Sequence, residues 1–357
     1  MTLGENWPIV FMGAGAVGSY VGGMLSVAGL EVTLVDAWPD HVDAIRADGL
    51  IIDTPEGVMT ARPRVLHISD AQQLADRPTA FAFLCVKLYD TNSSAALLGD
   101  VVQGAPIVTM QNALVEDDVA GIVGRERTLG AIAGTLDVSL MQPGRVRRSR
   151  RRGAPAPVFK VGELNGRNTP RAQAIADLLS KIDTAAVTTH LRDDRWAKLV
   201  ANTMTTGLSA VAGLPFLEVY RRDDTRRLAI SLAAEAFAVG QRLGFALQPV
   251  FGVSPHRWQA ADAGEGDAIS EAMNAMAAQR ATMSEGGISG TLQDLMKNRR
   301  TEVDYFNGYI ADQGRACGVP APTHEAVAAL IRQMERGEKR PAEEHLSALA
   351  RRYAMPR

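Results

Sequence analysis

The sequence predicts an α/β domain with a doubly wound parallel sheet, followed by an all-α domain. The chain has 357 residues, enough for about two domains of ordinary size. From Pro8 to about Asp193, short β-branched runs alternate with amphipathic stretches, as in parallel βαβ units. After Asp193, strand signals give way to helical periods rich in Ala, Leu and Met. We therefore predict two domains, residues 1–190 and 191–357.

The strands and helices of the first domain follow from this alternation. Gly29 and Gly49 lie just beyond the two predicted helices, where a left-handed residue commonly ends a helix. The predicted strands are Ile9–Met12, Val32–Val35, Thr79–Val86, Pro106–Met110 and Thr128–Ile132, and the helices are Val17–Ala28 and His41–Ala47.

An arginine-rich segment, Gly144–Gly162, resembles a hairpin with a charged tip. Its arginines, within Arg145–Arg152, could bind RNA, but the run lacks interleaved aromatic residues. We therefore favour a solvated hairpin. The helices predicted after it are Thr225–Leu243, Asp267–Glu285, Thr301–Ala316 and a solvated helix within Gly337–Arg357.

Composition and charge exclude several classes of protein. The 38 Lys and Arg residues against 40 Asp and Glu give a net charge of −2, which favours binding to neither nucleic acid nor an anionic membrane. We see no apolar run of roughly 20 residues and no basic region of a signal peptide. The two cysteines lie far apart, without metal-ligand spacing. We expect a cytoplasmic protein with no metal site and no disulfide framework.

The strongest motif is the glycine-rich turn Gly13–Gly18, which follows a predicted strand and precedes a predicted helix. Gly13 allows a tight turn, Gly15 lets backbone N–H groups approach a pyrophosphate, and Gly18 allows close helix–strand packing. The N-terminus of the helix, at Ala16 and Val17, then faces the phosphates. This predicts a Rossmann-type dinucleotide site; the alternative is a structural glycine turn.

Asp36 ends the second predicted strand, about 20 residues after the glycines. A carboxylate there accepts hydrogen bonds from the ribose hydroxyls of NAD and repels the 2′-phosphate of NADP. The sequence therefore favours NAD(H) over NADP(H). Two alternatives remain open: Asp36 could cap a helix, and Arg46 or the Arg145–Arg152 run could neutralise a phosphate.

Ordered blocks across nearly the whole chain resemble the ketopantoate reductases, also called 2-dehydropantoate 2-reductases. The resemblance implies an N-terminal Rossmann domain, a C-terminal helical domain and an active site in the cleft between them. The blocks are GAGAVGSYVGG, VTLVDAW, HVDAIRADGL, CVKLYDT, MQNAL, FKVGELNG, WAKLVANTMTTGLSAVAG, SGTLQDLMKNRRTEVDYFNGYI and GVPAPTHEAV.

The resemblance also implies roles for individual residues. Lys198 and Asn202 share one helix face at a spacing of four, and they match the family's general acid and a substrate ligand. An ammonium group both stabilises a developing alkoxide and supplies a proton. Lys87 and Glu302 match cofactor ligands, and Asn112 matches an asparagine where cofactor and substrate meet. Without the resemblance, each has a plainer interpretation, as a solvated, turn or helix-terminal residue.

Three positions depart from the family pattern. Thr206 replaces an asparagine, Gly290 replaces the second serine of a serine-rich triplet, and Ala113 replaces the glycine that follows Asn112 in the family. Thr206 and Ser289 are therefore our remaining candidates for substrate ligands. These departures leave the identity of the substrate open.

We therefore predict an NAD(P)H-dependent reductase of a 2-keto acid, ketopantoate or a relative, that acts as a homodimer. Two other functions remain possible. One is an NAD-dependent dehydrogenase of another hydroxy acid, working oxidatively in catabolism. The other is a dinucleotide sensor without catalytic activity, against which the Lys198 and Asn202 pair argues.

Overall fold

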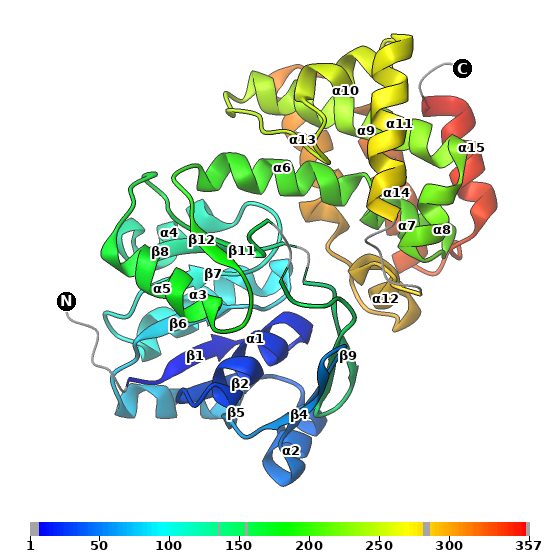
Figure 1. The fold of residues 1–357 in the computed structure, drawn as a ribbon. Coiled ribbons are helices and arrows are strands. Elements are labelled where there is room, and N and C mark those ends of the chain that lie inside the picture. Colours follow the sequence, from blue (N-terminus) through cyan, green and yellow to red (C-terminus); the bar gives the residue numbers. More distant parts are fainter. Residues whose placement is uncertain (1–6, 135, 154–155, 281–285, 355–357) are drawn as a thin grey trace. The chain divides into compact units, whose positions relative to one another are not determined.

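The computed structural model describes residues 7–134, 136–153, 156–280 and 286–354 (Figure 1). The chain divides into two compact units, residues 1–191 and 192–357. The first unit is built on sheets and the second on helices. Each unit is described by itself below.

The main sheet of the first unit has eight strands in the order β12-β11-β8-β7-β6-β1-β2-β5. All pairs in it are parallel except β8 with β11. From β1, the chain first adds β2 and β5 on one side and then β6, β7 and β8 on the other. The direction in which strands are added therefore reverses beside β1. The strands are β1 (Ile9–Met12), β2 (Val32–Asp36), β5 (Arg64–His67), β6 (Phe81–Leu84), β7 (Ile107–Thr109), β8 (Thr128–Ala133), β11 (Phe159–Glu163) and β12 (Ala185–Val187). The doubly wound sheet predicted from the sequence is confirmed.

Helices cover both faces of this sheet, because its central strands are apolar on both sides. On β1, Ile9 and Phe11 belong to one buried cluster and Val10 and Met12 to another. The first cluster includes residues of α1 (Ala16–Val27) and α5 (Pro170–Ser180), and the second includes residues of α3 (Thr91–Val101) and α4 (Glu116–Val123). Two separate cores thus hold the central strands in place.

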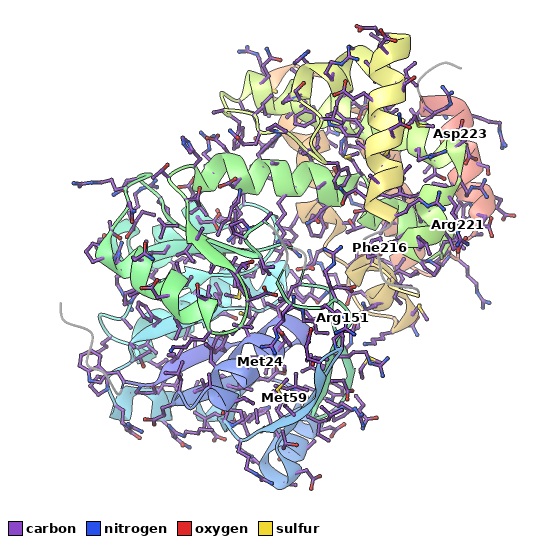
Figure 2. All side chains as sticks on the ribbon, in the orientation of Figure 1. Met24, Met59, Arg151, Phe216, Arg221 and Asp223 are labelled. Atoms are coloured by element: carbon purple, nitrogen blue, oxygen red, sulfur yellow. The ribbon has the colours of Figure 1, made fainter. Side chains whose placement is uncertain are left out.

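A second sheet of four strands, in the order β4-β3-β10-β9, was not predicted. It packs against α1, where Met24 lies in the buried cluster and Met59 of β4 packs on it (Figure 2). Its strands are β3 (Leu50–Thr54), β4 (Gly57–Ala61), β9 (Val138–Gln142) and β10 (Arg145–Arg148).

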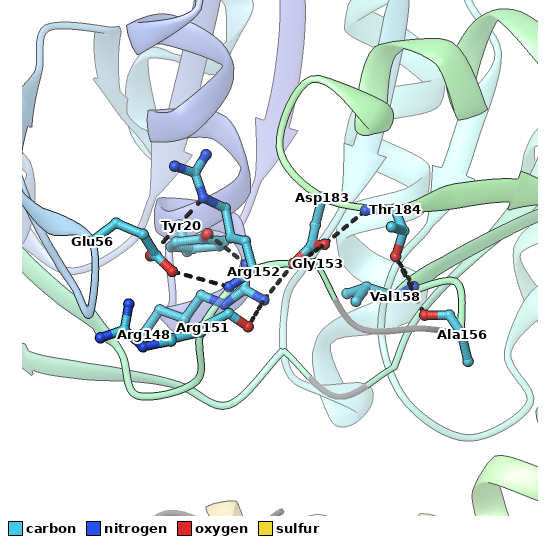
Figure 3. A network of polar contacts seen from close by, with 10 residues as sticks. All are labelled: Tyr20, Glu56, Arg148, Arg151, Arg152, Gly153, Ala156, Val158, Asp183 and Thr184. Carbon is cyan, nitrogen blue, oxygen red and sulfur yellow. Dashed lines mark hydrogen bonds and ion pairs between the residues drawn. The ribbon is translucent and has the colours of Figure 1, made fainter.

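The predicted solvated hairpin over 144–162 is wrong. The hairpin is formed by β9 and β10, and the later β-like run becomes β11 of the main sheet. Residues alternate between the two faces of β10, so Arg147 is exposed whereas Arg148 is buried. The Arg148 guanidinium forms an ion pair with Asp183 and donates a hydrogen bond to the Tyr20 hydroxyl of α1 at 2.9 Å (Figure 3).

The second unit is all-α, as predicted: its described residues form helices and loops, with one isolated β-bridge between Val250 and Val253. The predicted helix over 301–316 is instead a short 3₁₀ turn, Val303–Tyr305, followed by α13. None of the described helices is long and apolar enough to cross a membrane. The helices are α6 (Leu191–Thr203), α7 (Thr206–Ala212), α8 (Phe216–Arg221), α9 (Asp223–Arg242), α10 (Pro255–Asp262), α11 (Gly266–Arg280), α12 (Gly290–Met296), α13 (Asn307–Cys317), α14 (Pro322–Glu335) and α15 (Glu343–Tyr353).

A half-buried carboxylate joins two helices of this unit. Glu235 of α9 accepts hydrogen bonds from the backbone N–H groups of Thr323 and His324, in the first turn of α14. Burial raises the pKa of Glu235 to about 7, although these hydrogen bonds oppose the shift. The Glu235 carboxyl thus satisfies donors that a helix N-terminus otherwise leaves without partners.

Candidate functional site

The glycine turn joins β1 to α1 with no room for side chains at two of its positions. Gly13 has a φ of +94°, and a Cβ there would lie 2.7 Å from the Val86 nitrogen. A Cβ at Gly18 would lie 2.0 Å from the Gly13 carbonyl oxygen. These two glycines therefore have the turn and packing roles expected of them.

Gly15 differs from both, because a Cβ there would meet no described atom within 4 Å. Gly15 is the N-cap of α1, and among the described residues no side chain caps this end of the helix. Gly15, Ala16 and Val17 are half-buried, whereas Gly13 and Gly18 are buried. The open side of Gly15 and the positive end of the helix fit the phosphates of a dinucleotide.

Asp36 lies at the end of β2, beside this turn. Its Oδ2 accepts a hydrogen bond from the Ala14 N–H at 2.6 Å, and its Oδ1 accepts one from the Trp38 N–H at 2.9 Å. Trp38 is the N-cap of α2 (Pro39–Asp48), so Asp36 also contributes to the start of that helix. Each carboxylate oxygen keeps a second acceptor position. The capping interpretation and the ribose interpretation are therefore compatible.

Lys87 and Asn112 follow neighbouring strands of the main sheet. Lys87 comes after β6, which pairs with β1, and Asn112 comes after β7, which pairs with β6. Both residues are half-buried. The carboxyl ends of parallel strands meet at one edge, so the sheet brings both residues to the edge that carries the glycine turn. This is where ligands bind in doubly wound sheets.

Ala113, where the resemblance implies a glycine, has a φ of +60° and is buried. A left-handed conformation costs an alanine about 1–2 kcal/mol, whereas glycine adopts it freely.

We expect Ala113→Gly to raise the free energy of unfolding by about 0.5–1 kcal/mol, after the larger entropy of glycine in the unfolded chain is subtracted. Urea denaturation measures the change. The control is Ala120→Gly within α4, which should lower the free energy by about 1 kcal/mol. Destabilisation by both substitutions would contradict the argument from φ.

Lys198 and Asn202 lie on α6 with a spacing of one turn, and both are half-buried. Thr206 begins α7, and its hydroxyl donates a hydrogen bond to the Asn202 carbonyl oxygen at 2.7 Å. The three residues thus follow one another at intervals of four positions. The proton of the Thr206 hydroxyl is engaged with the backbone, although its oxygen can still accept.

Ser289 and Glu302 lie elsewhere in the helical unit. Ser289 is fully buried as the N-cap of α12, where its hydroxyl accepts a hydrogen bond from the Leu292 N–H at 3.0 Å. This cap accounts for a polar residue at that position. Glu302 is half-buried and precedes the 3₁₀ turn. The roles of Ser289 and Glu302 towards ligands stay predictions.

Two residues that support the glycine turn were missed by the sequence analysis. Ser19 of α1 and His41 of α2 are both buried, and the Ser19 Oγ lies 3.1 Å from the His41 Nε2. The Ser19 hydroxyl also donates a hydrogen bond to the Ala14 carbonyl oxygen at 2.5 Å. One serine and one histidine in two separate predicted helices gave no signal, because their contact arises only in the folded structure.

Two sequence models of one family match most of the chain. The model described as "Ketopantoate reductase PanE/ApbA" matches residues 9–163, and the one described as "Ketopantoate reductase PanE/ApbA C terminal" matches residues 190–335. Among curated proteins, the chain is 28% identical to a 2-dehydropantoate 2-reductase of Archaeoglobus fulgidus, over 92% of this chain and 98% of that protein. A protein of the same name from Mesorhizobium japonicum is also 28% identical, over 92% of this chain and 98% of that protein.

Solved structures show the same fold. A PanE/ApbA family ketopantoate reductase from Ralstonia eutropha has a TM-score of 0.75 and 27% identity, over 93% of this chain and 99% of that one. A D-mandelate dehydrogenase bound to NADH and anilino(oxo)acetate has a TM-score of 0.74, over 92% of this chain and 99% of that one. At 20% identity, this second likeness concerns the fold alone. With both of its halves matched by the family's own models, the chain belongs to the ketopantoate reductase family.

Proposed function

We propose that this protein is an NAD(P)H-dependent reductase that converts a 2-keto acid of the ketopantoate type into the 2-hydroxy acid. The observation that carries the proposal is the retention of two separate sets of residues. The first unit keeps the glycine turn, with an open side at Gly15. The second keeps Lys198 and Asn202 one turn apart on α6. A sensor would need only the first set.

The first unit would hold the dinucleotide. Backbone N–H groups of Gly15, Ala16 and Val17 would bind its phosphates, and the Asp36 carboxylate would bind its adenosine ribose. Lys87 and Asn112 would contact it from the ends of the next strands, and Glu302 from the helical unit. Bound there, the reduced nicotinamide supplies a hydride to the keto carbon.

Lys198 would serve as the general acid. As hydride reaches the keto carbon, negative charge develops on the carbonyl oxygen. The Lys198 ammonium stabilises this charge and donates a proton to that oxygen, which leaves a neutral hydroxyl in the product. Asn202, one turn away, would bind the substrate through its side-chain amide. Because both residues lie on α6, the helix fixes the spacing between them.

NADH should be used in preference to NADPH, because the Asp36 carboxylate would face the extra phosphate. Both Asp36 oxygens already accept backbone N–H bonds, which hold the carboxylate at the end of β2. We expect a preference in kcat/KM of about 5- to 150-fold, corresponding to about 1–3 kcal/mol. Steady-state kinetics with each cofactor measure it. A clear preference for NADPH would contradict the assignment and point to Arg46 or the Arg145–Arg152 run.

Ketopantoate should be a weaker substrate than another 2-keto acid, because two polar side chains of the family pattern are absent. Gly290 offers no side chain, and the hydroxyl proton of Thr206 is bound to the Asn202 carbonyl. Each substrate group left without a partner costs about 1–3 kcal/mol.

The test is a panel of 2-keto acids, ketopantoate included, assayed with NADH. Reduction of one or more members supports the proposed function, and the ranking tests the substrate argument. If ketopantoate has the highest kcat/KM, other groups replace the missing contacts. If no 2-keto acid is reduced while 2-hydroxy acids are oxidised, the protein is instead a hydroxy-acid dehydrogenase.

Assembly and cellular location remain predictions from the sequence. We expect a homodimer in the cytoplasm that binds neither nucleic acid nor membrane. Light scattering of the purified protein measures the first of these properties.

A further inference from the structure

A chain of hydrogen bonds runs from Gly144, between β9 and β10, through His41 in the first turn of α2 to the glycine turn. His41 is fully buried, and its Nδ1 accepts a hydrogen bond from the Gly144 N–H at 2.9 Å. A ring nitrogen that accepts from a backbone N–H carries no proton, so the proton of the neutral ring is on Nε2. Burial lowers the pKa of His41 and outweighs the opposing effects of the Asp36 charge and of a hydrogen bond with the Ala14 backbone, which favours the neutral ring.

The direction of the remaining bonds follows from this tautomer. His41 Nε2–H donates to the Ser19 Oγ at 3.1 Å, and the Ser19 hydroxyl donates to the Ala14 carbonyl oxygen at 2.5 Å. The three hydrogen bonds thus run in one direction, from the Gly144 N–H through His41 and Ser19 to the Ala14 carbonyl oxygen. The Trp38 ring stacks on His41 with centroids 5.8 Å apart, which restrains the imidazole plane.

The last bond of this series fixes a peptide group of the turn. In a trans peptide, the carbonyl oxygen and the N–H of the next residue point in opposite directions. The hydroxyl of Ser19 holds the Ala14 oxygen on the buried side, so the Gly15 N–H is turned away from it. The Ala14 N–H, in turn, donates a hydrogen bond to the Asp36 Oδ2 at 2.6 Å. The turn is therefore clamped on both sides of Ala14.

We propose that Ser19 and His41 are positioning residues that orient the Gly15 N–H towards the dinucleotide phosphates. The proposal rests on the proposed dinucleotide binding. It assigns to a buried serine and histidine a function in cofactor affinity, although neither would touch the cofactor. An alternative is that His41 only ties α2 to the turn between β9 and β10, through Gly144.

Two substitutions of His41 separate these possibilities. In His41→Gln, the amide nitrogen reaches the position of Nε2 and can donate to Ser19, but the bond from Gly144 is lost. In His41→Asn, the amide oxygen reaches the position of Nδ1 and can accept from Gly144, but the bond to Ser19 is lost. Ser19→Ala removes the bond to Ala14 directly. Ser26→Ala, near the end of the same helix, is the matched control.

The dissociation constant of NADH, measured by fluorescence titration, is the first readout. We expect Ser19→Ala and His41→Asn to weaken binding about tenfold, and His41→Gln and Ser26→Ala to stay within about threefold of wild type. Unchanged binding in Ser19→Ala would overturn the proposal. So would normal affinity in His41→Asn with reduced affinity in His41→Gln, which would assign His41 to the Gly144 contact alone.

Hydrogen exchange of the apo protein is the second readout, and it does not depend on the cofactor. The amides of residues 13–19 should exchange faster in Ser19→Ala and His41→Asn than in wild type, while the thermal midpoint reports whether each variant folds. Exchange as slow as in wild type would overturn the clamp. If the amides of the turn exchange slowly in wild type and faster in the variants, but wild type binds no dinucleotide, the proposed function fails. The role of Ser19 and His41 in holding the turn then stands.

Discussion

Lys198→Ala should lower kcat by about 10²–10⁴-fold, the range that general acid catalysis contributes. The substitution removes both the proton donor and the positive charge that stabilises the developing alkoxide. The dissociation constant of NADH should stay near that of wild type, because the glycine turn lies in the first unit and Lys198 on α6 in the second. Single-turnover kinetics and a fluorescence titration measure the two quantities.

Two further variants sharpen this experiment. Lys198→Arg keeps the charge but not a proton that can be given up, so kcat should remain at least about tenfold below wild type. Lys339→Ala, at an exposed position of the same unit, is the control and should leave kcat unchanged. Near-normal turnover in Lys198→Ala would remove this residue from the mechanism. Lost NADH affinity would reassign it to cofactor binding.

Arg148→Met should lower the free energy of unfolding by about 3–5 kcal/mol, because it leaves the buried Asp183 carboxylate without its charged partner. The Tyr20 hydroxyl also loses its hydrogen bond from Arg148. Arg147→Met, one position earlier on β10 and exposed, is the matched control and should change the free energy by less than about 0.5 kcal/mol. Urea denaturation of both variants measures the difference. A cost below about 1 kcal/mol for Arg148→Met would contradict the burial of this pair.

The same ion pair gives the stability a defined pH dependence. Burial alone would raise the pKa of Asp183, but hydrogen bonds from Arg148 and from the N–H groups of Thr184 and Gly153 outweigh it and lower the pKa. A lowered carboxyl pKa stabilises the fold above the ordinary aspartate pKa, and this contribution is lost as the pH falls through the folded-state value. The difference in the free energy of unfolding between wild type and Arg148→Met should therefore become smaller as the pH is lowered.

The central strands and the glycine turn could be predicted because their signals are local. Within a few residues, the sequence around Gly13 contains a buried strand, a tight turn and a helix, and each restricts the others. Gly29 and Gly49 ended the predicted helices correctly, with φ values of +84° and +86°. Short-range sterics decide such features, so no knowledge of the packing is needed.

The second sheet and the buried arginine could not be predicted in the same way. Arg148 lies among other arginines in the sequence, and its partner Asp183 is 35 residues away. Only the pairing of β10 with β3 and β9 decides which arginines face inward. Ser19 and His41 are separated by 22 residues and meet only in the folded chain, across α1 and α2. Contacts of this kind depend on tertiary structure, which a local pattern does not encode.

The measurement that tests the proposed reaction most directly is the fate of a labelled hydride. The protein is supplied with NADH carrying deuterium on one face of C4, and with the 2-keto acid that it reduces best. We predict that the deuterium of one C4 epimer appears at C2 of the hydroxy acid, and that the other epimer gives unlabelled product. Product without deuterium from either epimer, or no product from any 2-keto acid, would contradict direct hydride transfer by this protein.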